Sequence, residues 1–189
     1  MKTCAMFATA VAVVAVSGAA LAAAPEPLPA PWVITGMHPQ KFTAGVDQDP
    51  GVRGAKFLRN KADDPNAWAA LAQVISAQNY LGQRIRFRAF VKTQDVSGWA
   101  GLWMRVDSRA GRSIAFYNSA DRPIKGSTDW QERSVVLDVP QDAAVIVFGV
   151  NNIGKGQVWI DRLGFEQVGQ DVPVDTMQPV RPLPTVPVL

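Results

Sequence analysis

The side chains best suited to chemistry alternate along a short segment of this chain. Residues 99–107 (WAGLWMRVD) place Trp99, Trp103, Arg105 and Asp107 on one side of an extended backbone. Flat aromatic rings stack on the apolar C–H faces of sugars, and planar polar groups satisfy hydroxyl donors and acceptors. Two outward-facing Trp side chains indicate a ligand face, because large exposed apolar surfaces usually have a use.

Nearby segments add further candidates to this face. If residues 84–92 (RIRFRAFVK) lie in the same sheet as residues 99–107, their outward residues share its surface. On residues 113–118, Ile114 and Phe116 fit the core face, so Tyr117 is expected to point outward. The candidate ligand-binding residues are Trp103, Arg105, Asp107, Arg86, Arg88, Tyr117 and Asn118.

Two other interpretations of this face remain open. Its Arg and Asp side chains are also typical of a solvated sheet surface with cross-strand ion pairs. Alternatively, a loop such as residues 118–129 covers both Trp side chains and forms a second small core.

No arrangement of residues indicates catalysis. The single His and single Cys exclude a His cluster and any multi-thiolate metal site. His38 precedes Pro39 and has no evident partner for a catalytic triad. The sequence has no nucleophile elbow and no H-E-x-x-H motif, and no carboxylate pair stands out. We therefore expect a non-catalytic protein that needs no cofactor.

Composition places the chain among globular proteins. Its 189 residues are 48% hydrophobic and 19% charged, values that exclude a wholly disordered chain and suit one domain. The net charge of +3 is too small to indicate nucleic-acid binding by itself.

Alternating apolar residues predict a sheet protein. Ile85, Phe87, Leu102, Met104 and Val106 fall on the buried faces of their segments. Further strands are expected at 42–47, 54–59, 113–118, 131–138, 144–151 and 156–167, with Gly, Pro, Asp and Asn between them. This pattern indicates an antiparallel sandwich or barrel.

Residues 66–79 (NAWAALAQVISAQN) are ambiguous. Their helix formers and the preceding Asp residues favour a helix. As a strand, the segment has apolar residues on both faces, which suits a central strand. The all-β surroundings favour the strand, followed by a short helical turn at 77–81.

Both ends of the chain lie outside this expected domain of residues 32–168. Lys2, the apolar run 5–16 and the Ala-Leu-Ala sequence at 20–22 predict a signal peptide over residues 1–22, with a mature start near Ala23. The alternative is an uncleaved anchor, but the run is shorter than the ~20 residues that a span needs. We expect an exported protein, periplasmic or extracellular, with no stable membrane anchor.

Proline marks two flanking segments. Residues 23–31 (AAPEPLPAP) are expected to form an extended Pro/Ala-rich linker. Residues 169–189 form a Pro-rich tail that is expected to be disordered or polyproline-like. Such a tail is either a spacer or a docking peptide.

Several motifs resemble a known family. Residues 127–131 (STDWQ), 134–140 (SVVLDVP), 145–150 (VIVFGV) and 156–166 (GQVWIDRLGFE) resemble the closing half of carbohydrate-binding-module-like domains. Residues 98–107 (GWAGLWMRVD) and 118–130 (NSADRPIKGSTDW) resemble a bacterial subgroup of them. That subgroup includes secreted stand-alone proteins, domains attached to peptidases, and chains labelled transcriptional regulators. The resemblance covers about residues 42–168.

This resemblance implies an all-β, antiparallel jelly-roll β-sandwich of the galactose-binding-like type. In related jelly rolls, an Asp at the position of Asp161 helps to bind a structural calcium ion. Calcium takes six to eight oxygen ligands, and the neighbour here is Arg162, so Asp161 is a weak metal candidate. Many galactose-binding-like domains place their ligand at the loop edge of the sandwich.

The expected function is therefore that of an exported, non-catalytic binding module. Its partner is a carbohydrate or another extracytoplasmic ligand, bound through the face that carries Trp103 and Arg105. The alternative is an accessory protein that docks a partner protein through its sheet face or its Pro-rich tail. Nucleic acid is not an expected partner, because the predicted signal peptide would take the chain out of the cytoplasm.

Overall fold

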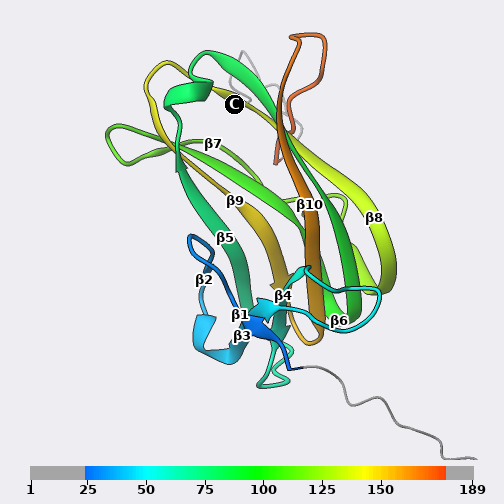
Figure 1. Cartoon of the computed structure of the whole chain (residues 1–189). Helices are drawn as coiled ribbons and strands as arrows, with labels where there is room; N and C mark the ends of the chain where they lie inside the picture. The colour runs from blue at the N-terminus through cyan, green and yellow to red at the C-terminus, as the bar shows by residue number, and fades with distance from the viewer. Residues whose placement is uncertain (1–23, 178–189) are drawn as a thin grey trace, which may run out of the picture.

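Antiparallel strand pairing organises the part of the chain that the structure describes. A computed structural model describes residues 24–177, in which every regular element is a strand or a short 3₁₀ turn (Figure 1). The strands are β1 (Glu26–Pro27), β2 (Val33–Thr35), β3 (Phe42–Val46), β4 (Lys56–Asn60), β5 (Trp68–Ser76), β6 (Gln83–Ser108), β7 (Ser113–Tyr117), β8 (Ile124–Val139), β9 (Ala143–Ile153) and β10 (Gln157–Val168). The all-β, antiparallel prediction is confirmed.

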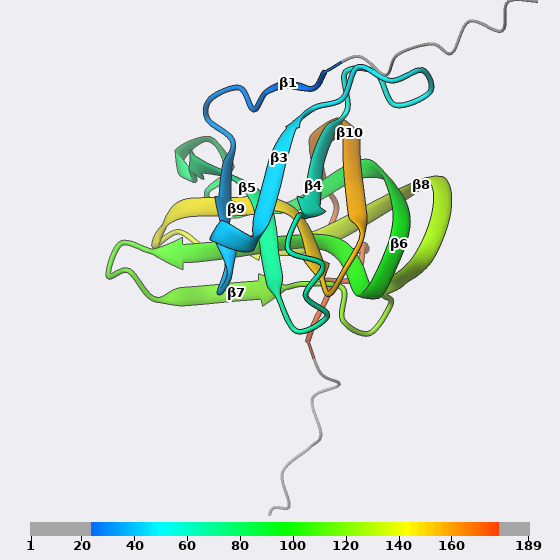
Figure 2. The ribbon, with the colours of Figure 1, turned by 90° about the horizontal axis from the view of Figure 1, so that it is seen from below.

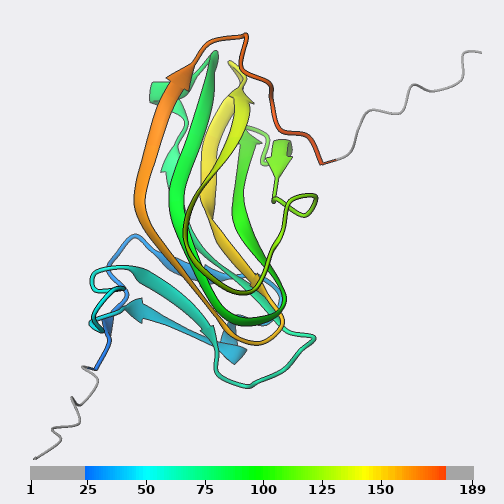
Figure 3. The same cartoon turned by 90° about the vertical axis from the view of Figure 1, so that its right-hand side faces the viewer.

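The long strand β6 belongs to both layers of the fold. Its first half pairs with β8 and β10, and its second half pairs with β9 and β7. Figures 2 and 3 show β6 curling from one side of the molecule to the other. The first layer therefore has the order β8-β6-β10-β4-β3-β1, and the second has the order β7-β6-β9-β5-β2.

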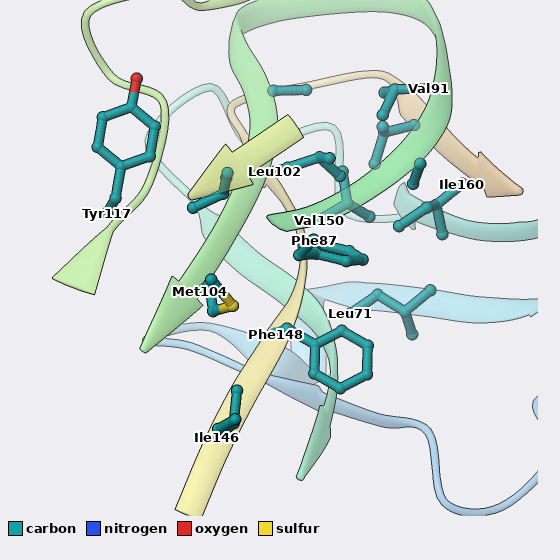
Figure 4. Packing of buried hydrophobic residues seen from close by; sticks show 14 of the residues in the cluster. Leu71, Phe87, Val91, Leu102, Met104, Tyr117, Ile146, Phe148, Val150 and Ile160 are labelled. Carbon is teal, nitrogen blue, oxygen red and sulfur yellow. The ribbon is translucent and has the colours of Figure 1, made fainter. Parts of the chain in front are cut away.

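The inner faces of the two layers form one apolar core. Ile85, Phe87, Leu102, Met104 and Val106 are fully buried in it, as their alternation predicts. Phe87 packs against Phe148 in this core (Figure 4), with 5.0 Å between the ring centres. The Phe165 ring lies 5.2 Å from the Phe87 ring. Edge-to-face and offset aromatic pairs of this kind add to the gain from burial.

Strand β5 shows tertiary contacts overriding helix propensity. Residues Trp68–Ser76 pair with β9 along their whole length, and Val33–Thr35 covers the other edge. Ala69 and Leu71 face the core, whereas Ala70 and Ala72 face outward. A 3₁₀ turn at Gln78–Tyr80 follows, so both the strand and the helical turn are confirmed.

Both ends of the described chain attach to the first layer. Glu26–Pro27 pairs with β3, and Leu28 packs against the core. After β10, the Asp175 amide donates to the Val136 carbonyl at 2.9 Å, and Arg122 pairs with the Asp175 carboxylate at 2.8 Å.

Several expectations about the chain ends lie outside residues 24–177. The predicted signal peptide falls there, as does most of the Pro-rich tail, and the domain limits stay predictions. Within the described residues, no helix is long and apolar enough to cross a lipid bilayer.

Replacing Phe87 with Ala should destabilise the protein by about 3–5 kcal/mol, because it leaves a cavity among packed aromatic rings. Urea unfolding followed by circular dichroism measures the change. Arg88→Ala is the matched control, because its side chain is 45% exposed and should alter stability by less than about 0.5 kcal/mol. If both variants lost the same free energy of unfolding, the assignment of Phe87 to the inner face of β6 and Arg88 to its outer face would be wrong.

Candidate ligand-binding face

A hollow of about 390 Å³ opens on the outer face of the second layer. Four aromatic side chains and four polar ones take part in its lining, together with two small residues and one Ile. They are Trp68, Trp99, Trp103, Phe116, Arg105, Asn118, Asn151, Thr35, Gly36, Ala70 and Ile153. The size falls within the range of ordinary small-molecule sites.

Strand register explains why the surface is hollowed. Trp68 on β5 and Trp99 on β6 both lie opposite Ile153 on β9. In the next outward-facing row, Asn151 lies between two small residues, Ala70 and Gly101. Aromatic side chains therefore stand beside a row of small ones, and the difference in side-chain length produces a depression.

Trp103 forms part of the floor of this hollow. It lies on the predicted face, but it is only 8% exposed, and the prediction of an exposed ring is wrong. It packs in a small cluster with Ala70, Ala72 and Val147 from β5 and β9. Trp103 therefore belongs to a second small core, as the alternative interpretation proposed. Residues of β5 and β9 form that core with it, instead of the loop 118–129.

Arg105 and Asp107 form an ion pair beside the hollow. The Arg105 Nη2 atom lies 2.9 Å from the Asp107 Oδ2 atom, and Arg105 Nε donates to the same oxygen at 3.1 Å. Both follow Trp103 on the outward side of β6, and Arg105 contributes to the lining. Arg105 therefore already has an anionic partner within the protein.

Tyr117 lies on the opposite side of β7 from its predicted position. It is 1% exposed, and its hydroxyl donates to the Asp121 carboxylate. Burial, together with that hydrogen bond, raises the pKa of Tyr117 to about 12. The cause is register: Tyr117 pairs with the core residue Met104, so Phe116 faces outward into the hollow.

Arg86 and Arg88 are separated from the other candidates. They lie on the outer face of the first layer, where Arg86 pairs with Glu166 at 2.8 Å and Arg88 with Glu132 at 3.6 Å. Because residues 84–92 and 99–107 are two halves of one strand in opposite layers, they share no surface. Asn118 does reach the hollow, as expected.

Several residues of the hollow were missed by the sequence prediction, three of them with aromatic or amide side chains. Trp68 and Phe116, at 37% and 39% exposure, and the buried Asn151 all line it. The alternation of Trp68 with Ala70 and Ala72 could have placed Trp68 on this face. That inference also needs strand Trp68–Ser76 to lie in the same sheet as residues 99–107, as it does through β9. The other two depend on long-range pairing that has no local signal.

Asp161 has a cationic neighbour on the same strand. Its carboxylate lies 3.9 Å from Arg162, whose guanidinium stacks 3.9 Å from the centre of the Phe90 ring. Among residues 24–177, no three His, Cys, Asp or Glu side chains lie close enough together to hold a metal ion.

Comparison with known proteins identifies one clear sequence relative. No family model matches the chain. A Bacillus subtilis (strain 168) protein, described as an uncharacterized HTH-type transcriptional regulator named YbfP, is 41% identical over 150 residues. The match takes in 78% of this chain and 51% of that protein, so the chain spans about half the length of this relative.

Several solved structures share the architecture of this chain, and carbohydrate-binding modules are among them. The CBM22-1 xylan-binding domain from Paenibacillus barcinonensis Xyn10C has a TM-score of 0.54 at 11% identity, covering 76% of this chain and 90% of that domain. The CBM22-1-GH10 modules of Clostridium thermocellum xylanase 10B, complexed with xylohexaose, have a TM-score of 0.52 at 15% identity, covering 72% and 26%.

An enzyme contains a similar fold. The enzymatically active domain of tailspike protein 4 from bacteriophage CBA120 has a TM-score of 0.55 at 15% identity, covering 74% of this chain and 20% of that one. Identities this low show a shared jelly-roll-like architecture and nothing about shared chemistry.

Trp103→Ala should lower the free energy of unfolding by about 3 kcal/mol or more, because it empties a packed cluster. Trp68→Ala should cost about 1 kcal/mol, since the Trp68 ring is more than one-third exposed. Thermal and urea denaturation of both variants tests the difference. A Trp103→Ala protein as stable as Trp68→Ala would contradict the buried position of Trp103.

Proposed function

We propose that this chain is a non-catalytic module that binds carbohydrate in the hollow of its second layer. The observation that carries the proposal is the gathering of Trp68, Trp99, Trp103 and Phe116 around one depression. Aromatic rings present flat apolar surfaces that match the C–H faces of pyranose rings, so such a cluster suits stacking against a sugar.

Polar groups are available at the same place. Arg105, Asn118 and Asn151 line the hollow beside the aromatic rings. A few placed polar groups in a mainly apolar site are typical of small-ligand recognition, because they fix the orientation of a ligand that stacking alone would leave free. The combination favours sugars over purely apolar ligands.

The fold supports this proposal without establishing it. A xylan-binding domain and this chain share their architecture over 76% of the chain, although one fold can serve many functions. The chemistry of the hollow therefore carries more weight than the likeness.

A second role follows from the Bacillus subtilis relative. The chain is 41% identical to part of a protein described as a transcriptional regulator. This likeness suits ligand sensing, in which one domain binds a sugar and thereby changes the activity of other domains of the same protein. Residues 24–177 contain no α-helix and therefore no counterpart of a helix-turn-helix. Docking of a partner protein on the same face is the remaining alternative.

Export is the companion proposal. Residues 1–22 carry the charge, apolar run and small-residue site of a secretory signal, and periplasmic or extracellular glycans would then be the accessible ligands. The relative's description as a regulator makes the cytoplasm the competing location.

Intact-mass measurement on protein recovered from a native-like host should show a mature chain that begins near Ala23. The reason is that Ala20-Leu21-Ala22 presents the small residues that signal peptidases accept. Cell fractionation of the same culture provides the control for location. Full-length chain found only in the cytoplasm would contradict export and favour the sensing role.

A glycan panel tests the binding role directly. We expect at least one of the hexaoses of xylose, glucose, mannose, galactose or N-acetylglucosamine to change the tryptophan fluorescence and to release heat in titration calorimetry. Trp68→Ala should weaken that binding at least tenfold while the protein stays folded, because stacked aromatic rings contribute strongly to affinity.

Arg86→Ala is the matched control for the panel. Arg86 lies on the other layer, outside the hollow, so its removal should leave affinity unchanged. Lack of binding to every glycan by the wild-type protein would rule out the proposed function. An affinity lost in Arg86→Ala but kept in Trp68→Ala would move the site to the first layer.

A further inference from the structure

Trp68 is the first residue of β5, at a point where that strand has lost one of its two neighbours. On one edge, β2 pairs with β5 only at residues 70–72, so the ladder on that side ends before Trp68. On the other edge, Trp68 still pairs with Ile153 of β9. Strand ends with few partners fray readily. Trp68 therefore needs a further partner on the β2 side if its position is to be fixed.

His38 supplies this partner. Its amide N–H donates to the Trp68 carbonyl at 3.1 Å, and the Trp68 amide N–H donates to the His38 Nδ1 atom at 3.3 Å. Nδ1 can accept a hydrogen bond only when it carries no proton, so a neutral imidazole with its hydrogen on Nε2 fits this arrangement. The single histidine of the chain therefore continues the pairing of β5 where β2 ends.

Gly36, two residues before His38, lies against the Trp68 ring. A Cβ atom added at Gly36 would be 2.9 Å from Cζ3 and 3.0 Å from Cε3 of that ring. The φ angle of Gly36 is +115°, a backbone conformation that residues with a Cβ rarely adopt. A glycine at this position therefore allows the turn of residues 36–38 to pack directly on the indole ring.

The ring that this turn holds is one that a ligand can reach. Trp68 keeps 37% of its surface exposed, and it lines the hollow together with Gly36. The turn thus contacts the backbone of Trp68 through His38 and its ring through Gly36, while part of the ring stays open to the hollow.

We infer that the turn of residues 36–38 is a positioning element, in which His38 and Gly36 fix Trp68 in the free protein for stacking on a sugar. This inference rests on the proposed function and names residues on which the affinity of that site depends. A ring that is already ordered loses less conformational entropy on binding than one that the ligand must order. His38 acts through Trp68 and needs no contact with the sugar itself.

Two substitutions at His38 separate the hydrogen bond from the shape of the side chain. His38→Phe keeps a flat ring but removes the acceptor. His38→Asn keeps an acceptor, because its Oδ1 atom lies as many bonds from the backbone as Nδ1 does. Calorimetric titration with the hexaose of the glycan panel that the wild type binds most tightly should show a roughly 2- to 12-fold loss of affinity for His38→Phe, the range for one neutral hydrogen bond. His38→Asn should restore binding close to that of the wild type.

Ser76→Ala is the matched control at the opposite end of β5. The Ser76 hydroxyl accepts from the Gln78 amide N–H at 3.2 Å, so this variant also removes a side-chain acceptor from a backbone donor. Ser76 is not among the residues that line the hollow, and its replacement should leave affinity unchanged. Circular dichroism shows whether each variant is folded.

Combining His38→Phe with Trp68→Ala tests whether His38 acts through Trp68. If it does, the double variant binds as weakly as Trp68→Ala alone, because the ring that His38 positions is already gone. If the two residues contributed independently, their fold-losses would multiply. A general structural role of His38 would give this second result.

A measurement without sugar tests the same inference on the free protein. The indole N–H of Trp68 gives a magnetic-resonance signal that is assigned by its loss in Trp68→Ala. Heteronuclear relaxation of this signal should show motion of larger amplitude in His38→Phe than in the wild type or in His38→Asn, because the end of β5 is then free to fray.

The outcomes separate the two proposals. If a hexaose binds and His38→Phe binds it as tightly as the wild type does, the inference is overturned and the proposed function stands. Equal losses in His38→Phe and His38→Asn, or losses that multiply in the double variant, overturn it in the same way. If the wild type binds no glycan, the proposed function falls. Unchanged motion of the Trp68 indole in His38→Phe would then overturn the positioning role as well.

Discussion

The sharing of β6 between the two layers is the constraint on which the rest of the structure depends. A strand that runs from Gln83 to Ser108 without a break carries its inside–outside alternation from one layer into the other. Its inward residues therefore meet in a single core, while its outward residues diverge to opposite surfaces. Arg86 and Trp103 both point away from that core, and for this reason they cannot serve one ligand.

The floor of the hollow depends on how one aromatic side chain is packed. Small residues on β5 and β9 leave room for Trp103 to lie deep in the face, where it contacts Ala72 and Val147 and contributes to stability. The same depth shields its N–H from water without giving it a partner. The free protein therefore gains stability from the packing of the Trp103 ring while the indole N–H stays without a hydrogen bond.

Local alternation was enough to predict which side of β6 is buried. Leu102 and Met104 are buried as their spacing requires, and even the helix-prone segment around Leu71 is a strand as predicted. Local patterns could not show that residues 84–92 and 99–107 lie in different layers, because that depends on which distant strands pair with each. The error at Tyr117 has the same origin, since Phe116 and Tyr117 are both aromatic and only pairing with Met104 decides which one is buried.

The placement of the chain ends bears on how one module could serve different proteins. β1 pairs with β3, and Asp175 is held on β8, so the chain enters and leaves the described domain along the first layer. The aromatic hollow lies on the outer face of the second layer. Both ends of the described chain therefore lie on the layer opposite to the hollow. This geometry suits an exported binding module and equally the ligand-sensing half of a longer chain, because neither role requires any change to the binding face itself.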